Sequence, residues 1–337
     1  MTPKRLEAIL QRAGQQRFLV IGDLMLDEFV WGRVGRISPE APVPVVEVTS
    51  ESCYAGGAAN VARNLREFTG QVEVVGILGQ DASGRQLRDL LKAQNIETSS
   101  LVEDADFRTI VKTRIIARQQ QVVRVDRERI VSLKPEQIAQ AVAAVRQKLP
   151  NIDAVIFEDY GKGFLASELV SQISRDAQAA GKVVAADPNP RHAIDWRGVT
   201  VVKPNRSEAF LAAGIPWHEA GDDPARDSDL LRVGDALLKK WETKYVLVTL
   251  GEQGMMLFQR DESPHHIPTK ARQVFDVSGA GDTAIALFTL ALCGGANPVE
   301  AAEIANHGSA VVVAKLGTAT ATPAELAASF REDLERG

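Results

Sequence analysis

Phe18-Leu-Val-Ile-Gly22-Asp23 is a short apolar run that ends in an acid, and runs of this kind recur along the chain. A run without polar alternation predicts a strand buried on both faces, as in a parallel sheet covered by helices. Similar runs lie at residues 72–79, 154–157, 183–186, 201–202 and 245–250. Segments with apolar residues at helical spacing, such as residues 138–149, lie between them. This order predicts an α/β fold: a doubly wound, mostly parallel sheet with helices on both faces.

Length and composition exclude several classes of protein. The 337 residues are 45% hydrophobic and 25% charged, which is ordinary for a globular protein. A net charge of −5 and an aromatic share of 5% make nucleic acid an unexpected partner. The two cysteines, Cys53 and Cys293, cannot build a disulfide framework. The start shows no signal peptide, and the longest uncharged apolar stretch, 283–295, is too short for a bilayer, so we expect a cytoplasmic protein.

Two stretches, residues 33–48 and 108–128, interrupt the alternation of strands and helices. The first carries three prolines before a valine-rich run, and the second contains two expected strands, 110–117 and 122–126. Neither stretch is followed at once by a helix. We therefore expect both to form a small antiparallel sheet, which projects as a lid from a single domain spanning residues 1–337.

The second of these stretches is basic within an acidic protein. From Arg108 to Arg129, seven Lys or Arg residues outnumber two Asp or Glu residues, a local charge of +5. This charge fits a solvated strand edge that prevents unwanted pairing. It fits equally well a lid that faces an anion.

The strongest chemical signal is Asp276-Val-Ser-Gly-Ala-Gly-Asp-Thr283, which lies between an expected strand over residues 273–277 and an expected apolar helix over 283–292. Small residues at a helix start let backbone N–H groups converge on an anion. Asp282 would repel a phosphate there, but it suits a base that takes a proton from a hydroxyl beside the phosphate, as in phosphoryl transfer to an alcohol. The alternatives are a simple helix cap and a dinucleotide-binding fingerprint, although no second strand follows. A Walker A sequence is absent.

Two motifs near the N-terminus offer groups for a polyol. Gly56-Gly57-Ala-Ala-Asn60 could let the backbone approach a ligand and present an amide to sugar hydroxyls, or could only pack a helix tightly. Asp23 and Asp27 follow the first strand, where open α/β sheets bind ligands. Simple loop acids are the alternative for these two residues.

Two later motifs lie at expected strand ends and suit a nucleotide. In Lys203-Pro-Asn-Arg-Ser-Glu208, Asn205 and Glu208 would share one face of a helix start. An acid near phosphates usually acts through Mg²⁺ and its waters. Thr249-Leu-Gly251-x-x-Gly254 is either a turn that approaches a nucleotide or a plain β-turn.

In this order, the motifs resemble the signatures of the ribokinase-like (PfkB-type) carbohydrate kinases over roughly residues 17–322. The stretch 56–60 is similar to the N-terminal signature of that family. The stretch 276–282 is similar to its C-terminal signature, with Ser278 where threonine is frequent. The resemblance implies the α/β fold described above and an ATP-dependent sugar kinase.

Three further segments, residues 35–47, 120–126 and 159–163, resemble the branch that phosphorylates D-glycero-β-D-manno-heptose 7-phosphate at C1. That product leads to the ADP-heptose of the lipopolysaccharide core. Many members of the branch are fused to a nucleotidylyltransferase. An H-x-G-H motif is absent and the chain ends soon after Thr322, so we expect a stand-alone kinase. The alternatives are another ribokinase-like kinase, for ribose, fructose or a fructose phosphate, and a non-catalytic sugar-sensing protein.

The resemblance implies a role for each matched position. Asp282 would deprotonate the anomeric hydroxyl, and the backbone N–H groups of Gly279, Ala280 and Gly281 would form the anion hole. The residues implied for ATP and Mg²⁺ are Asn205, Arg206, Ser207, Glu208 (Mg²⁺ through water), Thr249, Gly251, Gly254 and Asn306. Those implied for the sugar are Asp23, Asp27, Gly56, Gly57 and Asn60. Those implied for a monovalent cation such as K⁺ are Asp276, Ser278 and Gly317.

The 7-phosphate of such a substrate requires cations far from the transferring phosphoryl group. The candidates are Arg36, Arg118, Arg124 and Lys162, and the basic stretch 108–129 then has a function. In the family, projecting strands form a lid and often a dimer interface. We therefore expect a homodimer that pairs through the lid strands, with a sugar phosphate and ATP as ligands and no nucleic acid or membrane partner.

Overall fold

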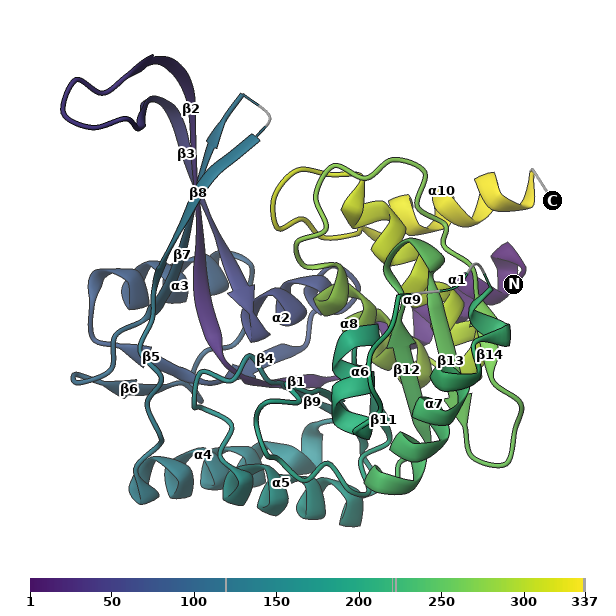
Figure 1. Ribbon diagram of the computed structural model, residues 1–337. Coiled ribbons are helices and arrows are strands. Elements are labelled where there is room, and N and C mark those ends of the chain that lie inside the picture. Colours follow the sequence, from purple (N-terminus) through teal and green to yellow (C-terminus); the bar gives the residue numbers. More distant parts are fainter. Residues whose placement is uncertain (119, 220, 222, 336–337) are drawn as a thin grey trace.

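The computed structural model describes residues 1–118, 120–219, 221 and 223–335, and its core is an eight-stranded sheet (Figure 1). The strand order is β14-β13-β12-β11-β10-β9-β1-β4, with parallel pairing from β4 to β12 and antiparallel pairing at β13 and β14. These strands are β1 (Phe18–Gly22), β4 (Val72–Val75), β9 (Ala154–Glu158), β10 (Val183–Asp187), β11 (Val201–Val202), β12 (Tyr245–Thr249), β13 (Met255–Gln259) and β14 (His265–Ile267). The predicted α/β fold with a mostly parallel sheet is confirmed.

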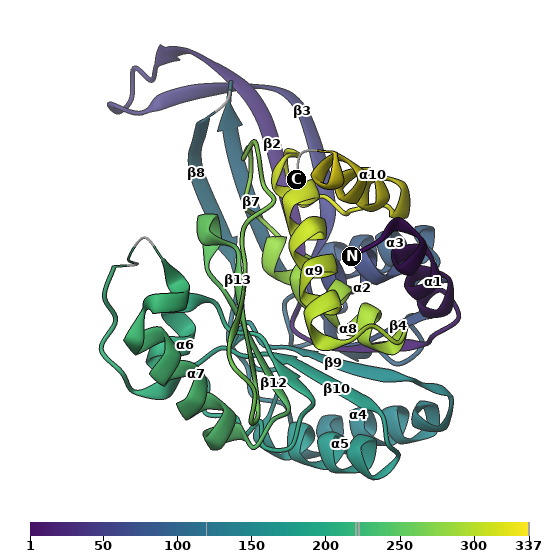
Figure 2. The same ribbon diagram turned by 90° about the vertical axis from the view of Figure 1, so that its right-hand side faces the viewer.

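Helices cover both faces of this sheet (Figure 2). Within β1, Phe18 and Val20 join one apolar cluster while Leu19 and Ile21 join the other, because successive side chains of a strand point to opposite faces. The first cluster receives α1 (Pro3–Ala13), α2 (Ala58–Arg66), α3 (Ala82–Ala93), α8 (Ala280–Cys293), α9 (Pro298–Val313) and α10 (Pro323–Leu334). The second receives α4 (Pro135–Lys148), α5 (Ser167–Ala179), α6 (Arg206–Ala213) and α7 (Ser228–Trp241). Across the described ranges, no helix combines the length and apolar character needed to cross a membrane.

A second sheet of four strands stands out from the core as the predicted lid (Figures 1 and 2). Its order is β3 (Pro44–Gly57), β2 (Leu24–Ile37), β7 (Ile110–Ala117) and β8 (Gln120–Arg127). The expected antiparallel pairing is wrong in one place, because β2 pairs parallel with β7. The lid strands are also longer than predicted, since the roots of β2 and β3 continue into the core cluster through Leu24, Leu26 and Ala55. Asp27 consequently lies inside a strand and not in a loop.

The predicted strand over residues 72–79 is broken into two pieces. Its first half is β4, and its second half, β5 (Ile77–Gly79), pairs with β6 (Val102–Asp104) in a separate small sheet. Gly76 lies at the break, where a Cβ atom would come within 2.5 Å of the Leu24 side chain and 2.9 Å of the Gly22 carbonyl oxygen. The chain therefore bends where it passes closest to the root of the lid.

The predicted strand over residues 273–277 is wrong. This segment is a loop that lies along the end of α9, where the N–H groups of Phe275 and Asp276 donate to the Val313 carbonyl at 2.8 and 3.3 Å. Both amides are thus satisfied without a strand partner. The helix that follows, α8, begins at Ala280, three residues before the predicted start.

His307 on α9 makes the stability of the fold depend on pH. It is 2% exposed and stacks on Phe330 of α10 with ring centroids 3.7 Å apart. Burial lowers the pKa of His307 from 6.5 to about 4, so the folded protein favours the neutral ring while the unfolded chain takes a proton near pH 6.5. This contribution is fully present above pH 6.5 and is lost as the pH falls towards 4.

We expect the free energy of unfolding to fall by about 3 kcal/mol over this range through His307 alone. His307→Phe keeps the aromatic stack but removes the titratable ring. The free energy of unfolding should then vary less with pH, as measured by urea denaturation at a series of pH values. His265→Phe, at an exposed position on β14, is the control. Identical slopes for the wild type and His307→Phe would contradict the assignment.

Candidate active site

Asp282 occupies the first turn of α8, at the point where that helix begins beside α2. The N-cap, Gly279, has φ +80°, a left-handed conformation, and a Cβ atom there would come within 2.6 Å of Asn60 Nδ2. Glycine therefore allows both the turn and the close approach of the two helices. The first N–H groups of a helix have no partner within the helix, so this turn presents donors next to the Asp282 carboxylate.

The Asp282 carboxylate is 4% exposed and hydrogen-bonded on both oxygens. Asn60 Nδ2 donates to Oδ2 at 2.7 Å, and the Tyr160 hydroxyl donates to Oδ1 at 2.8 Å. Burial raises the pKa of Asp282, and the two donors oppose that rise because they favour the ionised form. Arg63 donates in turn to Asn60 Oδ1 at 3.1 Å, which fixes the orientation of the amide.

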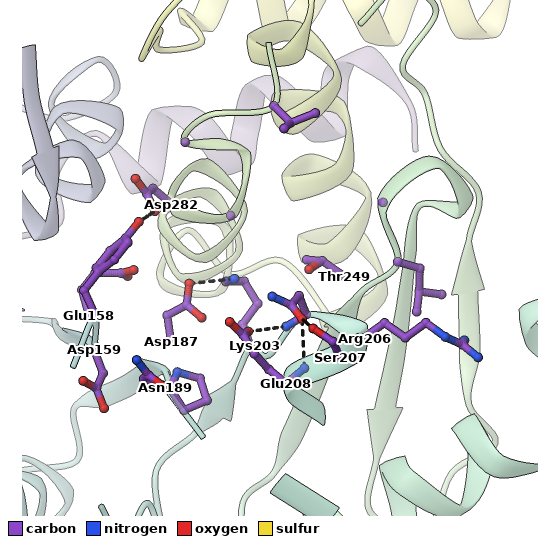
Figure 3. Close-up of a pocket in the computed structure, with 18 of the residues that line it drawn as sticks. Glu158, Asp159, Asp187, Asn189, Lys203, Arg206, Ser207, Glu208, Thr249 and Asp282 are labelled. Carbon is purple, nitrogen blue, oxygen red and sulfur yellow. Dashed lines mark hydrogen bonds and ion pairs between the residues drawn. The ribbon is translucent and has the colours of Figure 1, made fainter. Parts of the chain in front are cut away.

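Three charged residues lie side by side at the carboxyl ends of neighbouring parallel strands (Figure 3). Glu158 ends β9 opposite Asp187 at the end of β10, and Lys203 follows β11. Lys203 Nζ pairs with Asp187 Oδ2 at 2.7 Å, with the Lys203 side chain only 3% exposed. Burial lowers the pKa of Lys203, but the Asp187 and Glu158 carboxylates outweigh it and raise that pKa above its usual value.

Burial and the neighbouring charges also shift the pKa values of the two acids, Glu158 and Asp187. Burial, reinforced by neighbouring carboxylates, raises the pKa of Glu158 well above its usual value. Burial raises the pKa of Asp187 to about 7, against the opposing effect of Lys203. Glu158 Oε2 is buried without a hydrogen-bond partner in the described part of the chain. The site therefore holds more carboxylate than its one buried lysine neutralises, as at a site that receives cations or protons.

These side chains line a polar cavity of about 630 Å³ that also reaches Asp282 and Gly281. A second hollow of about 510 Å³, lined mainly by apolar side chains from residues 269–280 and 306–313, adjoins it. The two share the lining residues Thr249, Gly251, Val277 and Gly281. A polar chamber joined to an apolar groove suits a molecule with a charged end and a flat apolar end, as in a nucleoside triphosphate.

The residues predicted for the nucleotide all line one or both of these two hollows. Asn205, Ser207 and Glu208 line the polar chamber, and Gly254 and Asn306 line the apolar groove. Asn205 and Glu208 also form a capping box at the start of α6, with hydrogen bonds of 3.0 and 2.8 Å. Arg206 also lines the polar chamber (Figure 3), and its guanidinium pairs with Asp227 at 2.6 Å.

Of the residues predicted for the sugar, Asp27 and Gly56 meet at the root of the lid. Asp27 Oδ1 accepts from Arg114 at 2.5 Å, and a Cβ atom on Gly56 would come within 2.1 Å of Asp27 Oδ2. Gly57 has φ +61° and is the N-cap of the helix that carries Asn60. Asp23 binds the backbone of a neighbouring loop. Its carboxylate accepts hydrogen bonds from three N–H groups of the segment 160–164 at 2.9–3.1 Å.

The four cations predicted for the 7-phosphate do not all lie in one place. Lys162 lies close to the chamber, pairing with Glu128 at 2.7 Å, and Arg124 pairs with Asp126 at 2.9 Å on β8. Arg36 is exposed near the outer end of β2, and Arg118, with φ +57°, lies in the turn after β7. Lys162 and Arg124 are thus paired with the two acids of the basic stretch.

The three residues predicted for a monovalent cation come together around one carboxylate. Asp276 Oδ1 accepts from the Ser278 N–H at 2.9 Å, and Oδ2 accepts from the Gly317 N–H at 3.2 Å. Gly317 has φ +75°. The arrangement ties the loop before α8 to the loop after α9.

The site residues that were not predicted from the sequence include these four: Glu158, Tyr160, Asp187 and Lys203. Three of them end or follow parallel strands, and polar residues at strand ends were the available signal. Tyr160 lies in the segment 159–163 that resembles the family branch, but the sequence does not show its contact with Asp282, 122 residues away.

The chain is similar in sequence to known proteins. Bifunctional protein HldE of Trichlorobacter lovleyi is 40% identical over 329 residues, which cover 98% of this chain and 66% of that protein. Bifunctional protein HldE of Caulobacter sp. is 44% identical over 309 residues, covering 91% of this chain and 61% of that protein. The chain therefore spans slightly less than two thirds of the length of these relatives.

Two solved structures share the fold. Phosphofructokinase-2 from Escherichia coli in complex with potassium superposes with a TM-score of 0.76 at 18% identity, over 94% of this chain and 98% of that chain. Ribokinase from Arabidopsis thaliana, complexed with ribose and ATP, superposes with a TM-score of 0.69 at 19% identity, over 94% and 99%. The sequence model of the pfkB family carbohydrate kinases matches residues 15–325. With this match over nearly its whole length, the chain belongs to the pfkB family of carbohydrate kinases, which are phosphotransferases.

Proposed function

We propose that this chain transfers the γ-phosphoryl group of ATP to the anomeric C1 hydroxyl of D-glycero-β-D-manno-heptose 7-phosphate. The product is the 1,7-bisphosphate, for ADP-heptose and lipopolysaccharide core synthesis. The observation that carries the proposal is Asp282, a buried carboxylate in the first turn of α8 that lines the polar chamber. The likeness to HldE proteins at about 40% identity supports the choice of sugar, together with the segments 35–47, 120–126 and 159–163.

In the proposed mechanism, Asp282 accepts the proton of the C1 hydroxyl as its oxygen attacks the γ-phosphorus. Burial moves the pKa of Asp282 upwards, towards the range in which a carboxylate is an effective base. The N–H groups of Gly279, Ala280, Gly281 and Asp282 face the negative charge of the phosphoryl group, and the dipole of α8 acts in the same direction. Asn60 and Tyr160 hold the base in place.

The carboxylates of the chamber suit Mg²⁺, a hard cation that prefers oxygen ligands. Glu158 Oε2, buried and unpartnered in the described structure, is one such oxygen, and Asn205 and Glu208 would act on the ion through its waters. In the described ranges no three His, Cys, Asp or Glu residues form a metal cage, which agrees with an ion held largely by phosphates and water. When bound, Mg²⁺ supplies charge neutralisation for the phosphates. We propose K⁺ for the loops joined by Asp276.

Steady-state kinetics with a panel of sugars tests the proposal. ADP release should be at least about 100-fold more efficient, in kcat/KM, with the heptose 7-phosphate than with fructose 6-phosphate, fructose or ribose. A preference for one of those sugars would assign the chain to another kinase of the family. Absence of ADP release with every sugar would instead favour a non-catalytic sugar-sensing role.

Replacing Lys162 and Arg124, two of the cations predicted for the 7-phosphate, tests that assignment. Lys162→Ala and Arg124→Ala should each raise the KM for the sugar phosphate by about tenfold, because each removes one charge-assisted contact to the phosphate. The KM for ATP should change by less than about twofold. Arg146→Ala, which breaks a surface pair with Asp176 at 2.7 Å, is the control. An unchanged KM in both test variants would contradict the assignment.

We also propose that two copies pair through their lids. Six large apolar side chains on the lid are at least 38% exposed: Ile37, Val43, Val48, Val122, Val123 and Val125. β8, the edge strand, is exposed along its whole length. An exposed apolar edge strand is a natural surface for pairing. Light scattering should give twice the chain mass of 36.5 kDa, and a single chain mass would contradict the dimer.

A further inference from the structure

Tyr160 is the hydrogen-bond partner of Asp282 to which the sequence assigned no role. Its hydroxyl donates to Asp282 Oδ1 at 2.8 Å, and Asn60 donates to Oδ2 at 2.7 Å. Each oxygen of the carboxylate therefore has one hydrogen-bond donor that fixes its position. Each carboxylate oxygen can accept two hydrogen bonds, so a substrate hydroxyl can join as a third donor.

The backbone around Tyr160 is held tightly. The N–H groups of Tyr160 and Lys162 donate to Asp23 Oδ2 at 3.0 and 2.9 Å, and that of Phe164 donates to Oδ1 at 3.1 Å. Asp23 is only 2% exposed. Three charge-assisted bonds to one buried carboxylate leave this loop, residues 159–163, a single conformation.

Two glycines make that conformation possible. Gly161 and Gly163 have φ +66° and +107°, which L side chains rarely adopt. A Cβ atom on Gly163 would come within 2.1 Å of the Val131 carbonyl oxygen. Asp159 Oδ1 accepts from the Gly161 N–H at 2.8 Å and closes the turn. Tyr160 is thus presented to Asp282 by a rigid element.

The same loop also reaches the lid. Lys162, two residues after Tyr160, pairs with Glu128 at 2.7 Å, and Lys112 of β7 contacts that glutamate at 3.4 Å. A sugar phosphate that binds Lys162 therefore contacts the element that orients the base.

We infer that Tyr160 is a positioning residue: its hydroxyl holds Asp282 in the orientation and the ionised state that proton abstraction requires. The inference rests on the proposed function, in which Asp282 is the base. It adds a residue whose contribution appears in the pH dependence of the reaction and not in the binding of either substrate.

Tyr160→Phe tests the inference, because it removes the hydroxyl and leaves the backbone bonds to Asp23 in place. The acid limb of the kcat–pH profile should move up by about one pH unit, since the lost hydrogen bond favoured the ionised carboxylate. On the plateau, kcat should fall by about tenfold through lost orientation. The KM for each substrate should change by less than about twofold. A purely packing role would leave the acid limb where it is.

Two further variants complete the test. The control is Tyr245→Phe. Tyr245 is the first residue of β12, and its ring packs edge-on against Phe288 of α8. This variant should leave both the rate and the pH profile unchanged. Asp23→Asn should loosen the whole loop, so it should raise the KM for the sugar phosphate as well as lower kcat. This variant also keeps the idea testable if Tyr160→Phe fails to fold.

The outcomes separate the inference from the proposed function. An active wild type with an acid limb that Tyr160→Phe does not move would overturn the inference alone. A fall in kcat after Asp23→Asn with no change in the sugar-phosphate KM would contradict the role of the loop. A wild type that releases no ADP with any sugar phosphate would instead overturn the function on which the inference rests.

Discussion

Asp282→Asn is expected to lower kcat for phosphoryl transfer by about 10²- to 10⁴-fold, the range of a lost general base. The amide has the size of the carboxylate but cannot take the proton of the sugar hydroxyl. The start of α8 and the apolar groove stay intact, so the affinity for ATP should change by less than about twofold. Coupled measurement of ADP release gives kcat, and calorimetry gives the nucleotide affinity.

The matched control for this variant is Asp89→Asn, an exposed aspartate on α3. It removes one negative charge without touching the chamber and should leave kcat unchanged. If Asp282→Asn retained more than a tenth of the wild-type kcat, another group would have to be the base. A large loss of ATP affinity would show instead that the variant had disturbed the start of α8.

Lys203→Met is expected to lower the free energy of unfolding by about 3–5 kcal/mol, because it leaves the buried Asp187 carboxylate without its counter-charge. Glu158 and Asp282 lie close enough to add to that uncompensated charge. The loss should be larger at pH 8 than at pH 6, since protonation relieves the acids at lower pH. Urea denaturation at the two pH values measures it.

A second substitution separates lost charge pairing from lost packing. Asp187→Asn in the Lys203→Met background should recover more than half of the lost stability, because the carboxylate that Lys203 pairs with directly is then replaced by a neutral amide. Lys270→Met breaks a pair of equal length, 2.7 Å to Asp333, in which both side chains are more than a quarter exposed. That control should cost less than about 1 kcal/mol. Equal costs at Lys203 and Lys270 would refute the role of burial.

The sheet could be predicted from the sequence because its signal is local. A buried parallel strand such as β1 or β9 must be apolar on both faces, and that leaves an uninterrupted run of apolar residues. Where the prediction failed, at residues 273–277, the segment carries three apolar residues, Val274, Phe275 and Val277, which resemble a short strand. The deciding facts were the Val313 carbonyl that accepts its two amides and the absence of a pairing strand for this described segment.

The lid was predicted correctly in place and wrongly in pairing. Its sequence shows two hairpin-like stretches, but the parallel match of β2 with β7 joins residues more than 80 positions apart. No local pattern specifies such a partner. Which acids pair with the cations of the lid depends on the fold in the same way, since Asp27 meets Arg114, and Glu128 meets Lys162, only in the folded protein.

The sequence by itself determined the fold class, the family and the position of Asp282 at the start of an apolar helix. Each of these follows from local patterns, namely apolar runs, helical spacing and short motifs, taken in their order along the chain. Only the tertiary structure decided which strand ends meet, and so brought Glu158, Asp187 and Lys203 into one chamber and placed Tyr160 against Asp282. Such contacts depend on the order of strands in the sheet and on the packing of α2 and α8, which long-range burial sets.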